Sequence, residues 1–176
     1  MKKIDSKFFF YLSNALSLSR APLAFLFFYE NPILRSVSVL LAMFTDSIDG
    51  YLARKANSTS RFGAIVDPLM DKFFVYFVVS IFFLESKISI LSWLAFTSRD
   101  IAIFIFGSYL VSISYLKDYE IKSIVLGKIS TALQFIFLIL LSLNYNIPSI
   151  AYTIFIPLAL TAFLELIIQH RKCRIR

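Results

Sequence analysis

Six long apolar runs, separated by short polar connections, constrain the fold of this chain more than any other feature. A membrane-spanning helix needs about 20 mostly apolar residues, and each run has roughly that length. The runs cover Phe8–Tyr29, Ile33–Leu52, Phe62–Leu84, Ile88–Val111, Ile121–Leu143 and Ile147–Gln169. Open sheet edges are not tolerated against lipid. The sequence therefore predicts an all-α polytopic membrane protein, a bundle of six transmembrane helices.

Composition supports exposure of these runs to lipid. Of the 176 residues, 59% are hydrophobic, which is more apolar surface than a soluble domain of this length can bury. No internal repeat or low-complexity linker interrupts the chain, so we expect one domain over residues 1–176. The lone Cys173 excludes an intrachain disulfide.

Basic residues gather on alternate connections. The N-terminal segment, the Ala53–Arg61 and Lys117–Glu120 connections and the C-terminal tail carry most of them, whereas the other connections add only Arg35 and Lys87. With six spans these basic segments share one side, which predicts cytoplasmic N- and C-termini. The net charge of +7 then indicates contact with anionic membrane lipids rather than nucleic acid. The beginning of the chain is similar to a signal peptide, but Arg20 interrupts its apolar run, so we expect a first membrane helix there.

Four carboxylates cluster around the connection between the second and third runs. Asp46 and Asp49 are three residues apart, and Asp67 and Asp71 are four apart, so each pair lies on one helix face. Helices joined by a short loop are antiparallel neighbours, and both pairs can then point into one cavity. Four carboxylates stay ionised at low dielectric only beside cations. Oxygen ligands select Mg²⁺, Mn²⁺ or Ca²⁺, and two ions would balance the charge.

Small and basic residues flank the carboxylates. Gly50 and Gly63 have no side chain, so a bulky substrate can approach the backbone, and Arg54 can meet a phosphate. Metal ions held by carboxylates, with an arginine nearby, are typical of sites that transfer phosphoryl groups. The alternative is that the carboxylates only pair with Arg54, Lys55 and Lys72 to fix topology. Two acidic pairs with small residues on the same faces exceed what anchoring requires.

Together these residues form Asp46-x2-Asp49-Gly50-x2-Ala53-Arg54-x8-Gly63-x3-Asp67-x3-Asp71, which resembles the signature of the CDP-alcohol phosphotransferase family at all eight fixed positions. The resemblance implies an enzyme that binds CDP-diacylglycerol, transfers its phosphatidyl group to an alcohol and releases CMP. It also implies a homodimer in the bacterial cytoplasmic (inner) membrane, with the active site on the cytoplasmic side.

The resemblance also implies residue roles. The metal ligands would be Asp46, Asp49, Asp67 and Asp71, holding two Mg²⁺ or Mn²⁺ ions, with Asp71 also the catalytic base. CDP would be bound by Gly50, Ala53, Arg54, Ser60 and Gly63.

Further segments resemble phosphatidylglycerophosphate synthases and CMP-forming cardiolipin synthases, namely Asn14–Arg20, Asp67–Lys72, Ser98–Asp100 and Gly127–Thr131. They imply acceptor-binding roles for Arg99, Lys128 and Arg20. Asp100, Gly107 and Ser130 depart from the pattern of glycerol-3-phosphate users and are closer to cardiolipin synthases, whose acceptor is phosphatidylglycerol. The short chain and the Ala53–Asn57 stretch favour glycerol-3-phosphate.

Other interpretations stay open at this point. Arg99 could instead form a salt bridge with Asp100, and Lys128 could extend to the membrane interface. As a whole, the chain could be a small cation transporter, but its carboxylates gather near one side of two helices. It could also be a scaffolding subunit with a degenerate site, against which the four intact aspartates argue.

Overall fold

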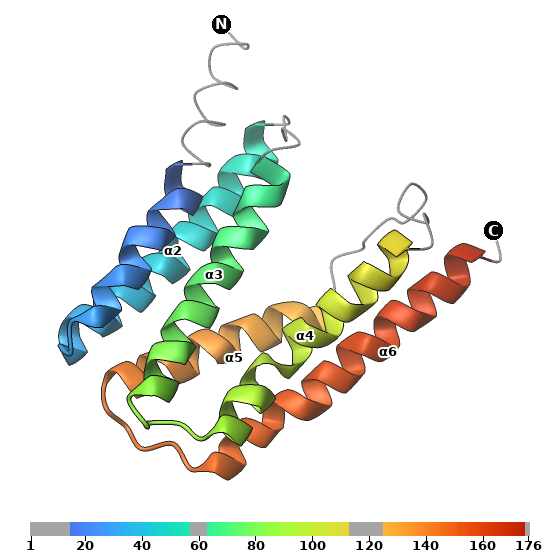
Figure 1. The fold of residues 1–176 in the computed structure, drawn as a ribbon. Helices are drawn as coiled ribbons and strands as arrows, with labels where there is room; N and C mark the ends of the chain where they lie inside the picture. Colours follow the sequence, from blue (N-terminus) through green and yellow to red (C-terminus); the bar gives the residue numbers. More distant parts are fainter. Residues whose placement is uncertain (1–14, 57–62, 113–124, 175–176) are drawn as a thin grey trace, which may run out of the picture. The chain divides into compact units, whose positions relative to one another are not determined.

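The described part of the computed structural model, residues 15–56, 63–112 and 125–174, contains helices and no strand (Figure 1). Residues 15–25 are helical and lead into the short 3-10 helix η1 (Leu26–Phe28). Then follow α2 (Pro32–Ala56), α3 (Gly63–Leu84), α4 (Ile90–Ser112), α5 (Val125–Ser142), the 3-10 helix η3 (Ser149–Ile154) and α6 (Phe155–Arg174). The all-α prediction is confirmed. By length and apolar content, no helix in these described ranges qualifies to cross a membrane.

Local sequence explains where α2 begins and ends. The Asn31 side chain caps its first turn, because Asn31 Oδ1 accepts the backbone N–H groups of Ile33 and Leu34 at 3.0 and 3.2 Å. Pro32 follows as the first helical residue, where its missing N–H costs nothing. The helix continues past the predicted end at Leu52 to Ala56. Ala, Arg and Lys are strong helix formers, so the basic segment extends the helix.

The sixth predicted run differs from a single helix. Its first part is the 3-10 helix η3, and the α-helix begins only at Phe155. Pro157 lies in the first turn of α6. Proline cannot donate a backbone hydrogen bond and is tolerated in an α-helix only near its start, which accounts for an α-helix that begins late.

Two compact units make up the chain. The first comprises Met1–Glu85 with Phe135–Asn146, and the second comprises Ser86–Gln134 with Ile147–Arg176. The division falls inside α5. The prediction of one functional domain over the whole chain stays a prediction.

In the first unit, η1 supplies the centre of the core. Phe27 is fully buried and meets Phe74 and Phe82 of α3 edge to face, with ring centroids 6.2 and 5.7 Å apart. Residues 15–25 are tied to α2 by the hydroxyl of Ser38, which donates to the Leu23 carbonyl at 2.6 Å. These contacts hold residues 15–25, η1, α2 and α3 together, and two of those helices carry the aspartates.

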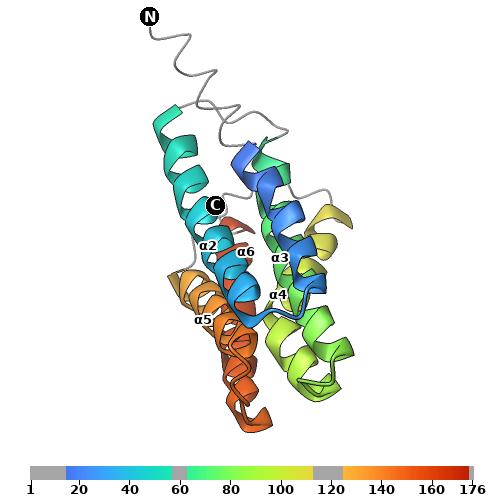
Figure 2. The same cartoon turned by 90° about the vertical axis from the view of Figure 1, so that its left-hand side faces the viewer.

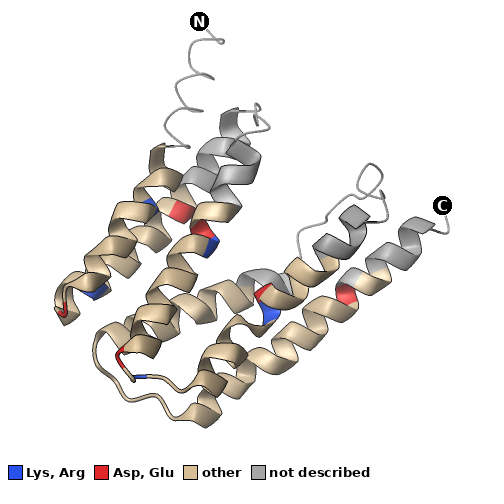
Figure 3. Ribbon diagram, in the orientation of Figure 1, with Lys and Arg blue, Asp and Glu red and all other residues tan. Residues whose placement is uncertain are grey.

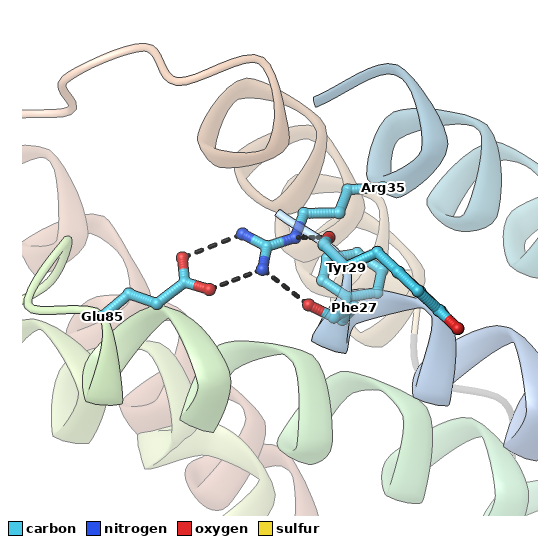
Figure 4. A network of polar contacts seen from close by, with 4 residues as sticks. All are labelled: Phe27, Tyr29, Arg35 and Glu85. Carbon is cyan, nitrogen blue, oxygen red and sulfur yellow. Dashed lines mark hydrogen bonds and ion pairs between the residues drawn. The ribbon is translucent and has the colours of Figure 1, made fainter. Parts of the chain in front are cut away.

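A buried arginine joins three elements of this unit (Figure 4). Arg35, only 2% exposed, donates to both carboxylate oxygens of Glu85 at 2.8 and 2.5 Å and to the carbonyls of Phe27 and Tyr29 at 2.6 and 2.9 Å. Its guanidinium also lies 5.7 Å from the ring centroids of Phe27 and Phe82. From the sequence, Arg35 was counted only among the basic residues that help to set the orientation of the predicted spans. Its partner Glu85 lies between the predicted runs that end at Leu84 and begin at Ile88. That connection was predicted on the same side of the membrane as the one between Tyr29 and Ile33.

In the second unit, α4 and α6 run along each other with η3 at one end (Figures 1 and 2). Phe96 of α4 lies 5.0 Å from Phe155 at the start of α6, measured between ring centroids. Further along, Phe106 meets Phe163 edge to face at 6.1 Å and packs with Ile103 and Ile167. These aromatic contacts fix the register of α4 against α6.

Candidate functional site

The structure places the four signature aspartates on two helices of the first unit. Asp46 and Asp49 belong to α2, and Asp67 and Asp71 belong to α3. The two helices run in opposite directions, as the short connection predicts (Figures 1 and 2). Figure 3 shows few charged positions on the described ribbon, with acidic positions on both α2 and α3. The predicted placement of the pairs on antiparallel helices is confirmed.

Two of these carboxylates have described side chains. Asp46 is partly exposed, with 44% of its side-chain surface open to solvent. Asp71 is half-buried, and its Oδ1 atom is inaccessible to solvent. The roles of Asp71 as a metal ligand and as the catalytic base stay predictions.

The remaining signature positions can be placed only by their helix. Beyond their helix, the structure does not describe these residues, which are Asp49, Gly50, Ala53 and Arg54 on α2 and Gly63 and Asp67 on α3. Ser60 lies outside the described residues altogether. Their roles in metal and CDP binding stay predictions.

Arg20 contacts a predicted metal ligand. Its Nη2 atom lies 3.3 Å from Oδ1 of Asp46, and the Arg20 side chain is only 1% exposed. The pair joins residues 15–25 to α2, beside the signature. Sequence reasoning assigned Arg20 to acceptor binding and did not anticipate this contact. The contact places a buried guanidinium directly beside a predicted metal ligand.

Metal binding by the signature carboxylates stays a prediction. Within the described residues, no group of three or more His, Cys, Asp or Glu side chains could hold a metal ion. The described carboxylates Asp46 and Asp71 are oxygen ligands of the kind that Mg²⁺ and Mn²⁺ prefer. Asp49 and Asp67 would complete the set from the same faces, at helical spacing.

The other acceptor-binding candidates belong to the second unit. Arg99 of α4 donates from Nη1 to Oγ1 of Thr131 on α5 at 3.3 Å, so its hydrogen bond goes to α5 and not to the adjacent Asp100. Asp100 is 6% exposed and accepts from Nε2 of Gln134 at 3.2 Å. Lys128 lies on α5, and its side chain is outside the described residues.

Gln134 is a polar residue that sequence reasoning missed. It is fully buried and bridges α5 to α4 through Asp100 and the Phe96 carbonyl. One signal was available, because Gln134 is an amide within the otherwise apolar run Ala132–Leu141. A buried amide in such a run needs a partner on a neighbouring helix.

Comparison with known proteins gives consistent matches. The profile of the family described as CDP-alcohol phosphatidyltransferase matches residues 10–164. A protein of Aquifex aeolicus named CDP-diacylglycerol--glycerol-3-phosphate 3-phosphatidyltransferase is 36% identical over 137 residues, which cover 74% of each chain. A Rickettsia bellii protein of the same name is 31% identical over 157 residues, covering 85% of this chain and 82% of its own.

A third relative carries a different name. A fusion protein of Schizosaccharomyces pombe, named cardiolipin synthase (CMP-forming) / mitochondrial hydrolase, is 45% identical over 67 residues, covering 36% of this chain and 11% of its own. No solved structure gives a significant match.

Proposed function

The chain belongs to the CDP-alcohol phosphatidyltransferase family, and from this premise we propose that it transfers the phosphatidyl group of CDP-diacylglycerol to glycerol-3-phosphate and releases CMP. The family membership inferred from the signature is confirmed by a profile match over residues 10–164. One observation favours glycerol-3-phosphate as the acceptor. Two relatives named for this reaction match over most of their length, at 36% and 31% identity.

The proposed reaction is a single displacement at phosphorus. The hydroxyl oxygen of the acceptor bonds to the phosphorus that carries diacylglycerol, and the bond from that phosphorus to the CMP oxygen breaks. Asp71 takes the hydroxyl proton. Its half-buried position on α3, on the helix that also carries Asp67, supports this assignment. Because the protein takes little part in the covalent chemistry, catalysis depends on how it orients the two substrates and stabilises the charge that develops.

The aspartates would hold the diphosphate through divalent cations. Two Mg²⁺ or Mn²⁺ ions, when bound by Asp46, Asp49, Asp67 and Asp71, supply positive charge to the diphosphate and to the departing CMP. The buried guanidinium of Arg20 lies 3.3 Å from Asp46 and would hold this ligand in place. Gly50, Ala53, Arg54, Ser60 and Gly63 would receive the cytidine nucleotide.

Arg99 and Lys128 would hold the phosphate of glycerol-3-phosphate. A guanidinium presents several donors in a planar fork that matches phosphate oxygens. Among the described residues, Arg99 makes one side-chain hydrogen bond, to Thr131, which leaves donors for a ligand. Arg20, by contrast, is committed to Asp46, so we assign it to the support of the carboxylates rather than to the acceptor.

The enzyme would work in a membrane. The six predicted spans, the basic segments on one side and large exposed apolar side chains support this proposal. The side chains of Ile33, Leu91 and Phe104 are 73 to 75% exposed. Such exposure is unfavourable in water and favourable in lipid. We propose a homodimer in the cytoplasmic membrane of a bacterium, with the aspartates on the cytoplasmic side, where a water-soluble nucleotide is released.

The second candidate acceptor is phosphatidylglycerol. A short stretch 45% identical to a fusion protein named for CMP-forming cardiolipin synthase favours it, as does the Arg99-Asp100 pair. That stretch covers only 36% of this chain, whereas the relatives named for glycerol-3-phosphate cover most of it. Glycerol-3-phosphate is therefore the preferred acceptor.

CMP release by the purified protein separates these acceptors. The protein would be given CDP-diacylglycerol and Mg²⁺ with glycerol-3-phosphate or with phosphatidylglycerol, and Asp71→Asn would serve as the inactive control. We expect CMP release only with glycerol-3-phosphate. CMP release only with phosphatidylglycerol would make the protein a cardiolipin synthase. No CMP release with either acceptor would point to another alcohol.

A further inference from the structure

A polar seam joins α4 to the first part of α5 in the second unit. Nε2 of Gln134 donates to the carbonyl of Phe96 and to Oδ2 of Asp100, each at 3.2 Å. Three residues earlier on α5, Oγ1 of Thr131 accepts from Nη1 of Arg99 at 3.3 Å. Gln134 and Phe96 are fully buried, and Asp100 is 6% exposed. We call these five residues the α4–α5 seam.

The amide of Gln134 fixes how α4 is rotated against α5. Phe96 and Asp100 lie one turn apart on α4, and one amide contacts both. Two anchor points one turn apart define both the rotation of a helix about its axis and its position along the neighbouring helix. Arg99 directly precedes Asp100, so its direction follows from that rotation. The Oε1 atom of Gln134 is buried with no hydrogen-bond partner among the described residues, so the amide is held by the two bonds from Nε2. Loss of those bonds would leave a buried donor unpaired, which is costly.

Arg99 itself is held loosely. Its hydrogen bond to Thr131 is long at 3.3 Å, and its buried Nε atom has no hydrogen-bond partner among the described residues. A guanidinium with donors to spare is ready to bind an anion but depends on its surroundings for direction. The next residue, Asp100, is joined to Gln134 at 3.2 Å.

From this arrangement we propose that Gln134 is a positioning residue, which orients Arg99 for the phosphate of the acceptor by locking Asp100 and the Phe96 carbonyl. The inference rests on the proposed function, since it takes the acceptor to be a phosphate-bearing alcohol. Gln134 itself touches no substrate. Its effect therefore falls on acceptor binding and leaves the CDP-linked donor and the chemical step alone.

The test is a comparison of KM values in the purified full-length protein. Gln134→Leu keeps the side-chain size and removes both hydrogen bonds. We expect its KM for glycerol-3-phosphate to rise about tenfold, the loss of roughly one well-made hydrogen bond, while kcat and the KM for CDP-diacylglycerol stay within about twofold. Gln134→Asn keeps an amide that is one methylene too short, and its acceptor KM should rise in the same way.

Thr97→Val is the matched control. Thr97 is fully buried on α4, close to the seam. Among the described residues its hydroxyl bonds only within its own helix, to the carbonyls of Trp93 and Leu94 at 2.9 and 3.4 Å. Neither KM should change in this variant. A general loosening of α4 would raise the acceptor KM here as well and would overturn the proposal.

The outcomes separate this inference from the proposed function. If the wild-type protein releases no CMP with glycerol-3-phosphate, the proposed function is contradicted. A wild-type protein that uses it, with a folded Gln134→Asn variant of unchanged acceptor KM, contradicts only the positioning role. Parallel rises in the KM for donor and acceptor also contradict that role, because they indicate a purely structural contribution.

Discussion

The buried guanidinium of Arg20 lies 3.3 Å from the carboxylate of Asp46, so residues 15–25 of the chain contact the metal-binding signature on α2. Arg20 is 1% exposed and the Asp46 side chain is 44% exposed. The cation is therefore enclosed by protein, whereas its partner keeps access to ligands. This asymmetry suits a carboxylate that is positioned by the protein and still open to a cation.

Removal of Asp46 should cost stability as well as activity. Asp46→Ala leaves a buried charge at Arg20 without this partner, and we expect a loss of about 1 kcal/mol in the free energy of unfolding, discounted for the exposure of Asp46. Adding Arg20→Met should recover the stability but not CMP release. Thermal unfolding and CMP assays on the single and double variants would check this. Equal stability of Asp46→Ala and wild type would contradict it.

The ion pair between Arg35 and Glu85 should contribute to the stability of the fold and not to catalysis. Glu85→Ala leaves the buried Arg35 without its carboxylate, and we expect a loss of about 3 kcal/mol in the free energy of unfolding. Arg35 precedes Asp46 by eleven residues on α2, which is about 16 Å along the helix. CMP release per folded molecule should therefore be unchanged.

The control for this ion pair is Arg35→Lys. An ammonium group cannot bind both oxygens of Glu85 together with the carbonyls of Phe27 and Tyr29, so this variant should also lose stability. Denaturant unfolding measures both changes. A fully stable Arg35→Lys variant would show that geometry at this arginine matters little.

Asp71→Asn should abolish catalysis without unfolding the protein. The amide is the same size as the carboxyl group but neither accepts the acceptor's proton nor carries charge. We expect kcat to fall about 10³-fold or more. Thermal unfolding would confirm that the variant is folded. Residual activity within tenfold of wild type would exclude Asp71 as the base.

Chelation should stop the reaction reversibly. Four carboxylates in one site repel each other and the diphosphate unless cations are bound. Treatment with EDTA is expected to eliminate CMP release, and Mg²⁺ or Mn²⁺ should restore it. Full activity in excess chelator would contradict the proposed metal site.

Much of the fold follows from the sequence because apolar length and helical spacing are local properties. The long runs become helices, and Asp46 and Asp71 fall on the two antiparallel helices that the short connection predicts. The late start of α6 depends on Pro157, a single residue within an otherwise continuous apolar run.

The pairings of polar side chains were harder to predict. Arg20 with Asp46, Arg35 with Glu85, and Gln134 with Asp100 each join helices whose rotation depends on the packing of the whole unit. A sequence shows which residues share one helix face, but it does not show which face meets which neighbour.

The most direct test follows an oxygen atom. Glycerol-3-phosphate labelled with ¹⁸O in its primary hydroxyl would be incubated with CDP-diacylglycerol, Mg²⁺ and the purified protein, and lipid and nucleotide would be analysed by mass spectrometry. Since the acceptor oxygen attacks the phosphorus bearing the lipid, we expect a labelled phosphatidylglycerophosphate and unlabelled CMP. Unlabelled lipid, or CMP released only when phosphatidylglycerol is supplied, would contradict the account.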